Sequence, residues 1–79
     1  MQGFIVKQPY ASQIINGTKK FEFRNFKTKK LNEPCYLLSE GYVLGTIMFT
    51  KIKEINKDWK YAWSIKIIKK LAKPWKYKH

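Results

Sequence analysis

The fold of this chain is constrained most by residues 17–24, Gly-Thr-Lys-Lys-Phe-Glu-Phe-Arg, where a glycine directly precedes an alternating segment. A glycine just past an apolar-periodic segment typically ends a helix in the left-handed conformation. Successive side chains of a strand point to opposite faces of the sheet. The stretch therefore predicts a helix that ends at Gly17 and a strand whose Phe21 and Phe23 face the core. The open face would carry Lys20, Glu22 and Arg24.

The residues upstream predict a short helix from Gln8 to Asn16. Pro9 would lie in its first turn, where a missing backbone N–H leaves no hydrogen bond unmade. The helix would bring Lys19 to the start of the next strand, beside Glu22. Its apolar stripe is formed by Ala11, Ile14 and Ile15.

Short apolar and β-branched runs predict further strands. Phe4–Val6 is expected to be a buried strand, and residues 25–34 a mobile basic loop that ends at Pro34. Residues 35–38 predict a strand and residues 39–41 a turn. A long strand from Tyr42 to Ile55 should bend near Gly45 or Thr50, and residues 56–58 should form the next turn.

Residues 61–71 fit two periodicities. Tyr61, Trp63, Ile65 and Ile67 share one face of a strand, whereas Ile65, Ile68 and Leu71 form a helical stripe. The β-branched and aromatic content favours the strand. A helix would make this lysine-rich segment a cationic membrane-surface element. Residues 74–77 are expected to form a basic, aromatic tail.

The charge is strongly positive, since 17 Lys and Arg residues against five Asp and Glu give a formal net charge of +12. A field of this sign attracts polyanions, so RNA, DNA and anionic membrane are the candidate partners. The hydrophobic fraction of 44% excludes a disordered chain. We expect residues 1–79 to form a single domain, because the chain is too short for a second core.

The single cysteine, Cys35, cannot form an internal disulfide, and its apolar neighbours predict a buried small side chain rather than a reactive thiol. A reducing cytoplasm fits this usage. There is no obvious export signal, and no window approaches the ~20 apolar residues that span a bilayer. One cysteine and the terminal His79 do not supply a zinc ligand set, and clustered carboxylates for magnesium are lacking. We therefore expect neither metal nor cofactor.

The spacing Gly17-x-Lys19-x-x-Glu22-x-Arg24, preceded by Lys-Gln-Pro-Tyr-Ala-Ser at residues 7–12, resembles the signature of the ASCH family. These are small β-barrel domains of the PUA-like superfamily. The resemblance implies a mainly β, α+β fold: a barrel or half-barrel of about five strands with one helix between the first two. It also implies that Lys19, Glu22 and Arg24 line a cleft sized for a nucleotide-like ligand.

The likeness continues through residues 45–47 and 61–66, which are similar to later family strands, and covers residues 4–75. A closing strand usually follows in the family, whereas this sequence ends at His79. The sequence therefore leaves both a closed barrel and a half-barrel with an open edge as alternatives. The open edge would be shielded by lysines or would pair with a second copy of the chain in a homodimer.

Two function classes follow, beside the membrane-surface hypothesis that a helical 61–71 would support. The first is an RNA- or nucleotide-binding module with a basic cleft and exposed aromatic rings for base stacking. Trp63 is expected in the core, and at least one of Trp59, Trp75 and Tyr77 is expected to be exposed. The predicted nucleic-acid-binding residues are Lys19, Lys20, Arg24, Lys27, Lys29, Lys30, Trp59, Trp75 and Tyr77.

The second class is a hydrolase, because some members of the resembled family cleave RNA and others are amidohydrolases of an acylated pyrimidine nucleoside. Lys19, Glu22 and Arg24 would then be catalytic. Lys19 would orient the attacking group and Glu22 would transfer protons, or Lys19 and Arg24 would stabilise phosphorane charge. The amidohydrolases tend to carry threonine where Glu22 stands, which counts against that activity. The alternative to any site is an exposed Glu22–Arg24 pair that contributes ~0.2–1 kcal/mol.

Overall fold

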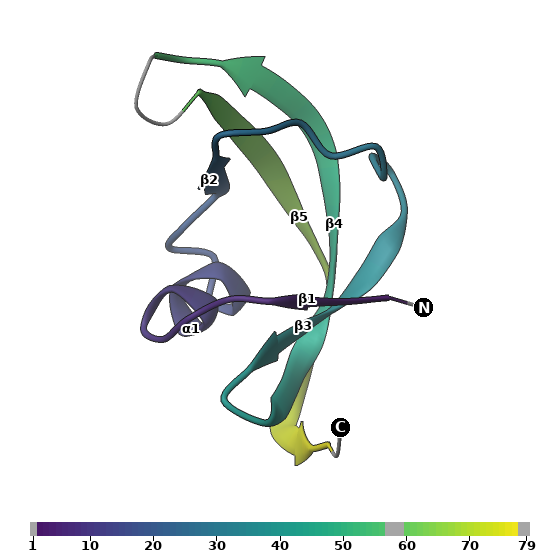
Figure 1. Ribbon diagram of the computed structural model, residues 1–79. Coiled ribbons are helices and arrows are strands. Elements are labelled where there is room, and N and C mark those ends of the chain that lie inside the picture. The colour runs from purple at the N-terminus through teal and green to yellow at the C-terminus, as the bar shows by residue number, and fades with distance from the viewer. Residues whose placement is uncertain (1, 57–59, 78–79) are drawn as a thin grey trace.

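The computed structural model describes residues 2–56 and 60–77 as one curved, mainly β structure (Figure 1). The five strands of its sheet lie in the order β1-β3-β4-β5-β2. β1 is parallel to β3, and the other neighbouring strands are antiparallel. The elements are β1 (Gln2–Ile5), α1 (Tyr10–Ile15), β2 (Phe21–Arg24), β3 (Pro34–Ser39), β4 (Tyr42–Glu54) and β5 (Tyr61–Lys76).

This architecture confirms the predicted half-barrel with one helix between its first two strands. β1 and β2 are the two edges of the sheet, and among the described residues they do not pair with each other. The sheet is therefore open between these two strands. Any cleft lined by both of them lies where a closed barrel would have its seam.

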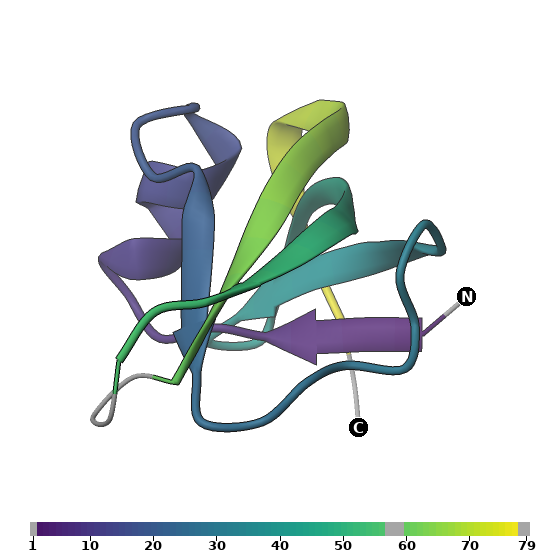
Figure 2. The same ribbon diagram turned by 90° about the horizontal axis from the view of Figure 1, so that it is seen from above.

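The two long strands β4 and β5 curve together through the molecule (Figures 1 and 2). Their register shifts between Val43 and Gly45 and again between Phe49 and Lys51, which confirms the predicted bends. A side chain at Gly45 would collide with the backbone carbonyl oxygen of Lys69 and with the side chain of Ile15. Only glycine allows this close approach.

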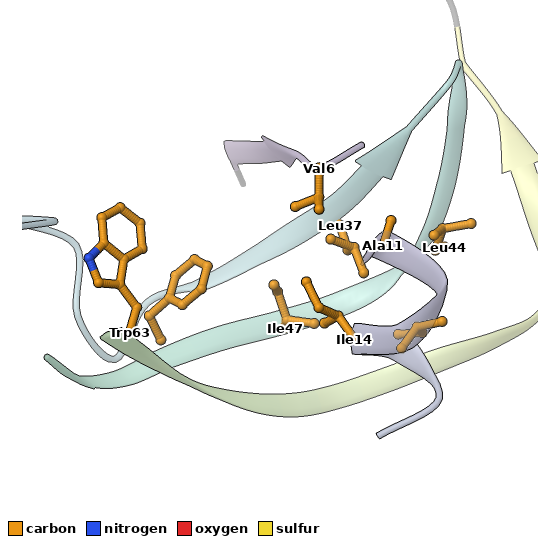
Figure 3. Close-up of a cluster of buried hydrophobic side chains, with 9 residues drawn as sticks. Val6, Ala11, Ile14, Leu37, Leu44, Ile47 and Trp63 are labelled. Atoms are coloured by element: carbon orange, nitrogen blue, oxygen red, sulfur yellow. The ribbon is translucent and has the colours of Figure 1, made fainter. Parts of the chain in front are cut away.

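The helix α1 packs against the inner side of the curved sheet. It begins one residue after Pro9, and Gly17 follows its end with a left-handed φ of 82°, as predicted. Its apolar stripe of Ala11, Ile14 and Ile15 is buried. These side chains meet a core contributed by Val6, Leu37, Leu44, Ile47, Phe49 and Trp63 (Figure 3).

The ambiguous segment at residues 61–71 is a strand, so the strand interpretation is confirmed. It belongs to β5, which continues to Lys76 and includes most of the expected aromatic tail. The membrane-surface hypothesis required a helix here and is wrong on that premise. No helix in residues 2–56 and 60–77 is long and apolar enough to cross a membrane.

Two details differ from expectation, and a third is not tested. The first strand begins and ends earlier than predicted, so that Ile5 is 63% exposed and the buried Val6 lies just past the strand. Cys35 is half-buried rather than buried, because it lines a cavity beneath the loop at residues 25–33. The turn predicted at residues 56–58 extends outside the described residues.

Candidate functional site

The edge strand β2 presents the opposite face from the one predicted. Glu22 is only 7% exposed, whereas Phe21 and Phe23 are 43% and 40% exposed. The cause is the register with β5, which places Glu22 directly opposite the buried Trp63. Directly opposed residues of paired strands share one face of the sheet. The carboxylate therefore points inward, and the two rings point outward.

The buried carboxylate is held by Arg24, two residues along the same face. Arg24 donates to Glu22 Oε2 from Nε at 2.9 Å and from Nη2 at 2.6 Å. The arginine side chain is 32% exposed and the glutamate side chain 9%. Within residues 2–56 and 60–77, Glu22 Oε1 has no hydrogen-bond partner. Oε2 is therefore fixed by Arg24, and Oε1 is available to accept a hydrogen bond from a ligand.

Lys19 is held by aromatic rings rather than by Glu22. Its Nζ lies 4.6 Å from the centroid of the Phe23 ring and 5.8 Å from that of Tyr10. A cation over an aromatic face is attracted by the negative face of the ring. Lys19 and Glu22 border the same cleft as predicted, but Glu22 forms its ion pair with Arg24.

These residues line a cleft of about 500 Å³ between the end of β1 and the strand β2, which we call the Lys19 cleft. Its volume is within the ~300–1,000 Å³ typical of small-molecule sites. Of the residues that the structure describes, three cations and one carboxylate border it, so its field is positive. The lining consists of Ile5, Val6, Lys7, Tyr10, Lys19, Glu22, Phe23 and Arg24.

The predicted basic residues do not all converge on this cleft. Lys20 is exposed and lies outside the lining of the cleft. The loop lysines diverge, since Lys27 lies 5.6 Å from the ring of Tyr61 and Lys30 borders the cavity beneath the loop. Lys29 is exposed and borders none of these hollows. The loop thus extends the positive surface instead of forming one clamp with Lys19.

The predicted aromatic residues also separate. Trp63 is 2% exposed in the core, as expected, and Trp75 is 62% exposed. Trp75 pairs with Val43, whereas β2 pairs with the opposite end of β5. Tyr77 is half-buried, and its N–H donates to Gly41 O at 2.9 Å. Trp59 lies outside the described residues. Trp75 is therefore an exposed ring that does not line the Lys19 cleft.

Sequence reasoning missed Ile5, Lys7, Tyr10 and Phe23 as lining residues. The alternating pattern predicts Phe23 in the core, and the sequence gives Tyr10 no role beyond the start of the helix and the family signature. Their proximity to Glu22 in the signature was the available signal. What it could not reveal is that the first turn of α1 faces the edge strand β2 across the cleft.

Together, the open sheet, the basic surface and the buried Glu22–Arg24 pair define a small half-barrel domain with a polar, cation-lined cleft at its seam. The family model described as ASCH domain matches residues 4–77, nearly the whole chain. The protein belongs to the ASCH domain family, which confirms the resemblance drawn from the signature. No curated protein matches the chain.

Proposed function

We propose that the protein binds single-stranded RNA or a nucleotide in the Lys19 cleft. The observation that carries this proposal is a buried Glu22 whose Oε2 is held by Arg24 while Oε1 is unpaired among the described residues. A polar acceptor at the base of a positive cleft suits a ligand with N–H donors and a negative charge. Nucleotides combine both, and the ASCH family is commonly linked to RNA binding.

The base would be recognised by Glu22 and by an aromatic ring. Glu22 Oε1 would accept a hydrogen bond from a ring or exocyclic N–H of the base. Tyr10 is 52% exposed at the cleft, so its ring offers a stacking surface. Single-stranded nucleic acid is favoured because only unpaired bases present these edges and faces.

The phosphate would be bound by the cations at the cleft. Lys7 and Lys19 border it, and Lys19 is positioned by the rings of Phe23 and Tyr10. The net charge of +12 attracts the polyanion over a longer range. The exposed loop lysines would then contact the backbone of a longer RNA without selecting its sequence.

The proposal is tested by comparing Lys19→Ala with Lys66→Ala, which removes an exposed lysine of β5 that borders neither the Lys19 cleft nor the loop cavity. We expect Lys19→Ala to weaken nucleotide and short-RNA binding by ~30-fold or more, a loss of about 2 kcal/mol. Lys66→Ala should change binding less than about threefold. Equal effects of the two variants, measured by fluorescence anisotropy, would show that only the net field matters.

A second candidate is a hydrolase that acts on RNA, which the burial of Glu22 in a cation-lined cleft favours. Glu22 would exchange protons through Oε1, and Lys19 would stabilise charge that develops on the phosphate. Incubating the protein with labelled RNA decides between the candidates. Cleavage by the wild type that Glu22→Gln abolishes supports the hydrolase, and binding without cleavage supports the module.

A further inference from the structure

A second cavity lies beneath the loop at residues 25–33 and on the other side of Phe4. We call it the Phe26 pocket, and its volume is about 690 Å³. It is lined by Phe4, Phe26, Asn32, Cys35, Phe49 and Trp63, among others, and Lys30 borders it. None of the roles proposed above for the Lys19 cleft uses this cavity.

Aromatic rings that pack against one another form the inner wall of the Phe26 pocket. The rings pack edge to face. The distance between ring centroids is 5.4 Å for Trp63 and Phe26, 5.1 Å for Trp63 and Phe49, and 4.9 Å for Phe4 and Phe49. The indole N–H of Trp63 already donates to Phe26 O at 3.1 Å. Trp63 and Phe49 are only 2% and 4% exposed, so the open ring surface in this wall is chiefly that of Phe26, which is 51% exposed.

The mouth of the pocket is polar and is positioned by the loop backbone. Asn32 has a left-handed φ of 62°, a conformation that asparagine tolerates better than most residues. Its N–H donates to Phe49 O at 2.7 Å, which ties the loop to the sheet. Lys30 and Glu33 border the same mouth. A planar ligand with polar edges fits this arrangement better than a wholly apolar one.

The two cavities share one stacked pair of side chains. The guanidinium carbon of Arg24 lies 4.9 Å from the ring centroid of Phe4. Arg24 lines the Lys19 cleft, and Phe4 lines the Phe26 pocket. Arg24 donates to Glu22 through Nε and Nη2, and Nη1 has no hydrogen-bond partner within the described ranges 2–56 and 60–77. A guanidinium with spare donors between two cavities suits a phosphate that links two ligand groups.

We propose that the Phe26 pocket holds a second nucleobase, so that the ligand is a single strand of at least two nucleotides bridged by a phosphate at Arg24. This inference rests on the proposed function, because the Lys19 cleft must hold the first nucleotide. A base suits this pocket on three grounds: the exposed ring of Phe26, the polar mouth, and the contact of Arg24 with Phe4, which joins the pocket lining to that of the cation-lined cleft.

Affinity for matched ligands provides the first test. A dinucleotide should bind about tenfold more tightly than its 5′-mononucleotide, as expected for one further base stacked on an aromatic ring. Phe26→Leu should reduce dinucleotide affinity to the mononucleotide level and leave mononucleotide affinity unchanged. Tyr42→Leu is the control, since it removes an exposed ring that borders neither cavity.

The only cysteine of the chain, Cys35, reports directly on occupancy because it lines the Phe26 pocket. Burial raises the pKa of its thiol, so alkylation by iodoacetamide is measured at about pH 8.5, where part of the thiol ionises. A saturating dinucleotide should slow alkylation at least fivefold, and a saturating mononucleotide should leave the rate unchanged.

The outcomes separate the two proposals. If neither ligand binds, or Lys19→Ala has no effect, the proposed function fails. If the two ligands bind equally and Cys35 stays unprotected, the proposed function stands and the second base site is refuted. Tighter dinucleotide binding that leaves Cys35 unprotected and is insensitive to Phe26→Leu also refutes it, because the second base then lies elsewhere. Protection of Cys35 by the mononucleotide alone would place the first base in this pocket and overturn the inference.

Discussion

The substitution Glu22→Gln should change the affinity for RNA in opposite directions, depending on whether the Lys19 cleft is a specific site or part of a general positive surface. It keeps the shape of the side chain but removes the one negative charge that the described residues contribute to the lining of the Lys19 cleft. If only the field matters, RNA should bind more tightly, by up to about fivefold, since one screened charge pair contributes at most ~1 kcal/mol. If Glu22 recognises the base, binding should weaken.

The expected loss follows from the geometry at Oε1. A hydrogen bond to a charged group contributes ~1.5–3 kcal/mol, and a neutral amide oxygen retains part of it. Arg24 would also lose a charged acceptor for both of its donors to Oε2, so the amide would be held less firmly. We therefore expect the affinity for a nucleotide to fall about tenfold, which corresponds to ~1.4 kcal/mol.

The assay combines short RNA with a panel of neutral nucleosides, for which the long-range field contributes little. The best-binding nucleoside is compared with its analogue methylated at the donor nitrogen. In the wild type, methylation of the nucleoside should lower its affinity about tenfold. In Glu22→Gln the same methylation should change the affinity little, because the substitution and the methyl group weaken the same hydrogen bond. Calorimetric titration measures each affinity.

Stability must be controlled in the same experiment. Glu22 is 7% exposed, but the Arg24 side chain is 32% exposed and can reach water when its partner is neutral. We expect the free energy of unfolding to fall by only ~1–2 kcal/mol. Binding is then measured well below the melting temperature. Unchanged or improved affinity for RNA and for every nucleoside, in a folded variant, would refute the role assigned to Glu22.

Three further predictions address the surface, the fold and the half-buried cysteine. The binding constant for single-stranded RNA should fall with salt at a log–log slope of roughly −3 to −4 for four to six phosphate contacts, and a flat salt titration would contradict polyanion binding. Gly45→Ala should lower the free energy of unfolding by ~3 kcal/mol or more, because the new Cβ would meet the carbonyl oxygen of Lys69. Gly17→Ala has open space around it and should lower the free energy of unfolding by only ~1–2 kcal/mol, for the left-handed φ. Equal shifts of the melting temperature in the two variants would argue against the close approach. Burial raises the pKa of the Cys35 thiol, so the folded state keeps this proton to higher pH and the free energy of unfolding should fall as pH rises above ~8.5. In urea titrations at pH 7 and pH 9.5 this fall should be larger for the wild type than for Cys35→Ala. Parallel falls in the two proteins would be inconsistent with the prediction.

The order and type of the elements were predictable from the sequence because they depend on local chemistry. Gly17 ends α1 in the left-handed region, and Gly41 has a φ of 84° in the turn between β3 and β4, positions that most other residues adopt at a cost. The β-branched and aromatic content of residues 61–71 indicated a strand, and Gly45 marked a bend of β4. The signature at residues 17–24 likewise placed Lys19, Glu22 and Arg24 near one another.

Only the tertiary structure decided which face of β2 points inward. A strand with alternating polar and apolar residues fits a sheet in either orientation, and a shift of one residue in register exchanges its two faces. Pairing with β5 placed Glu22 opposite Trp63, so a carboxylate was buried and two phenylalanine rings were exposed. The loss of solvation is offset by the two hydrogen bonds from Arg24. The sequence indicated that Glu22 and Arg24 could pair at the surface, but not that the carboxylate would be buried. Long-range pairing also set where the remaining rings lie, because β2 pairs with residues 61–64 of β5 whereas Trp75 pairs with Val43 at the other end of that strand.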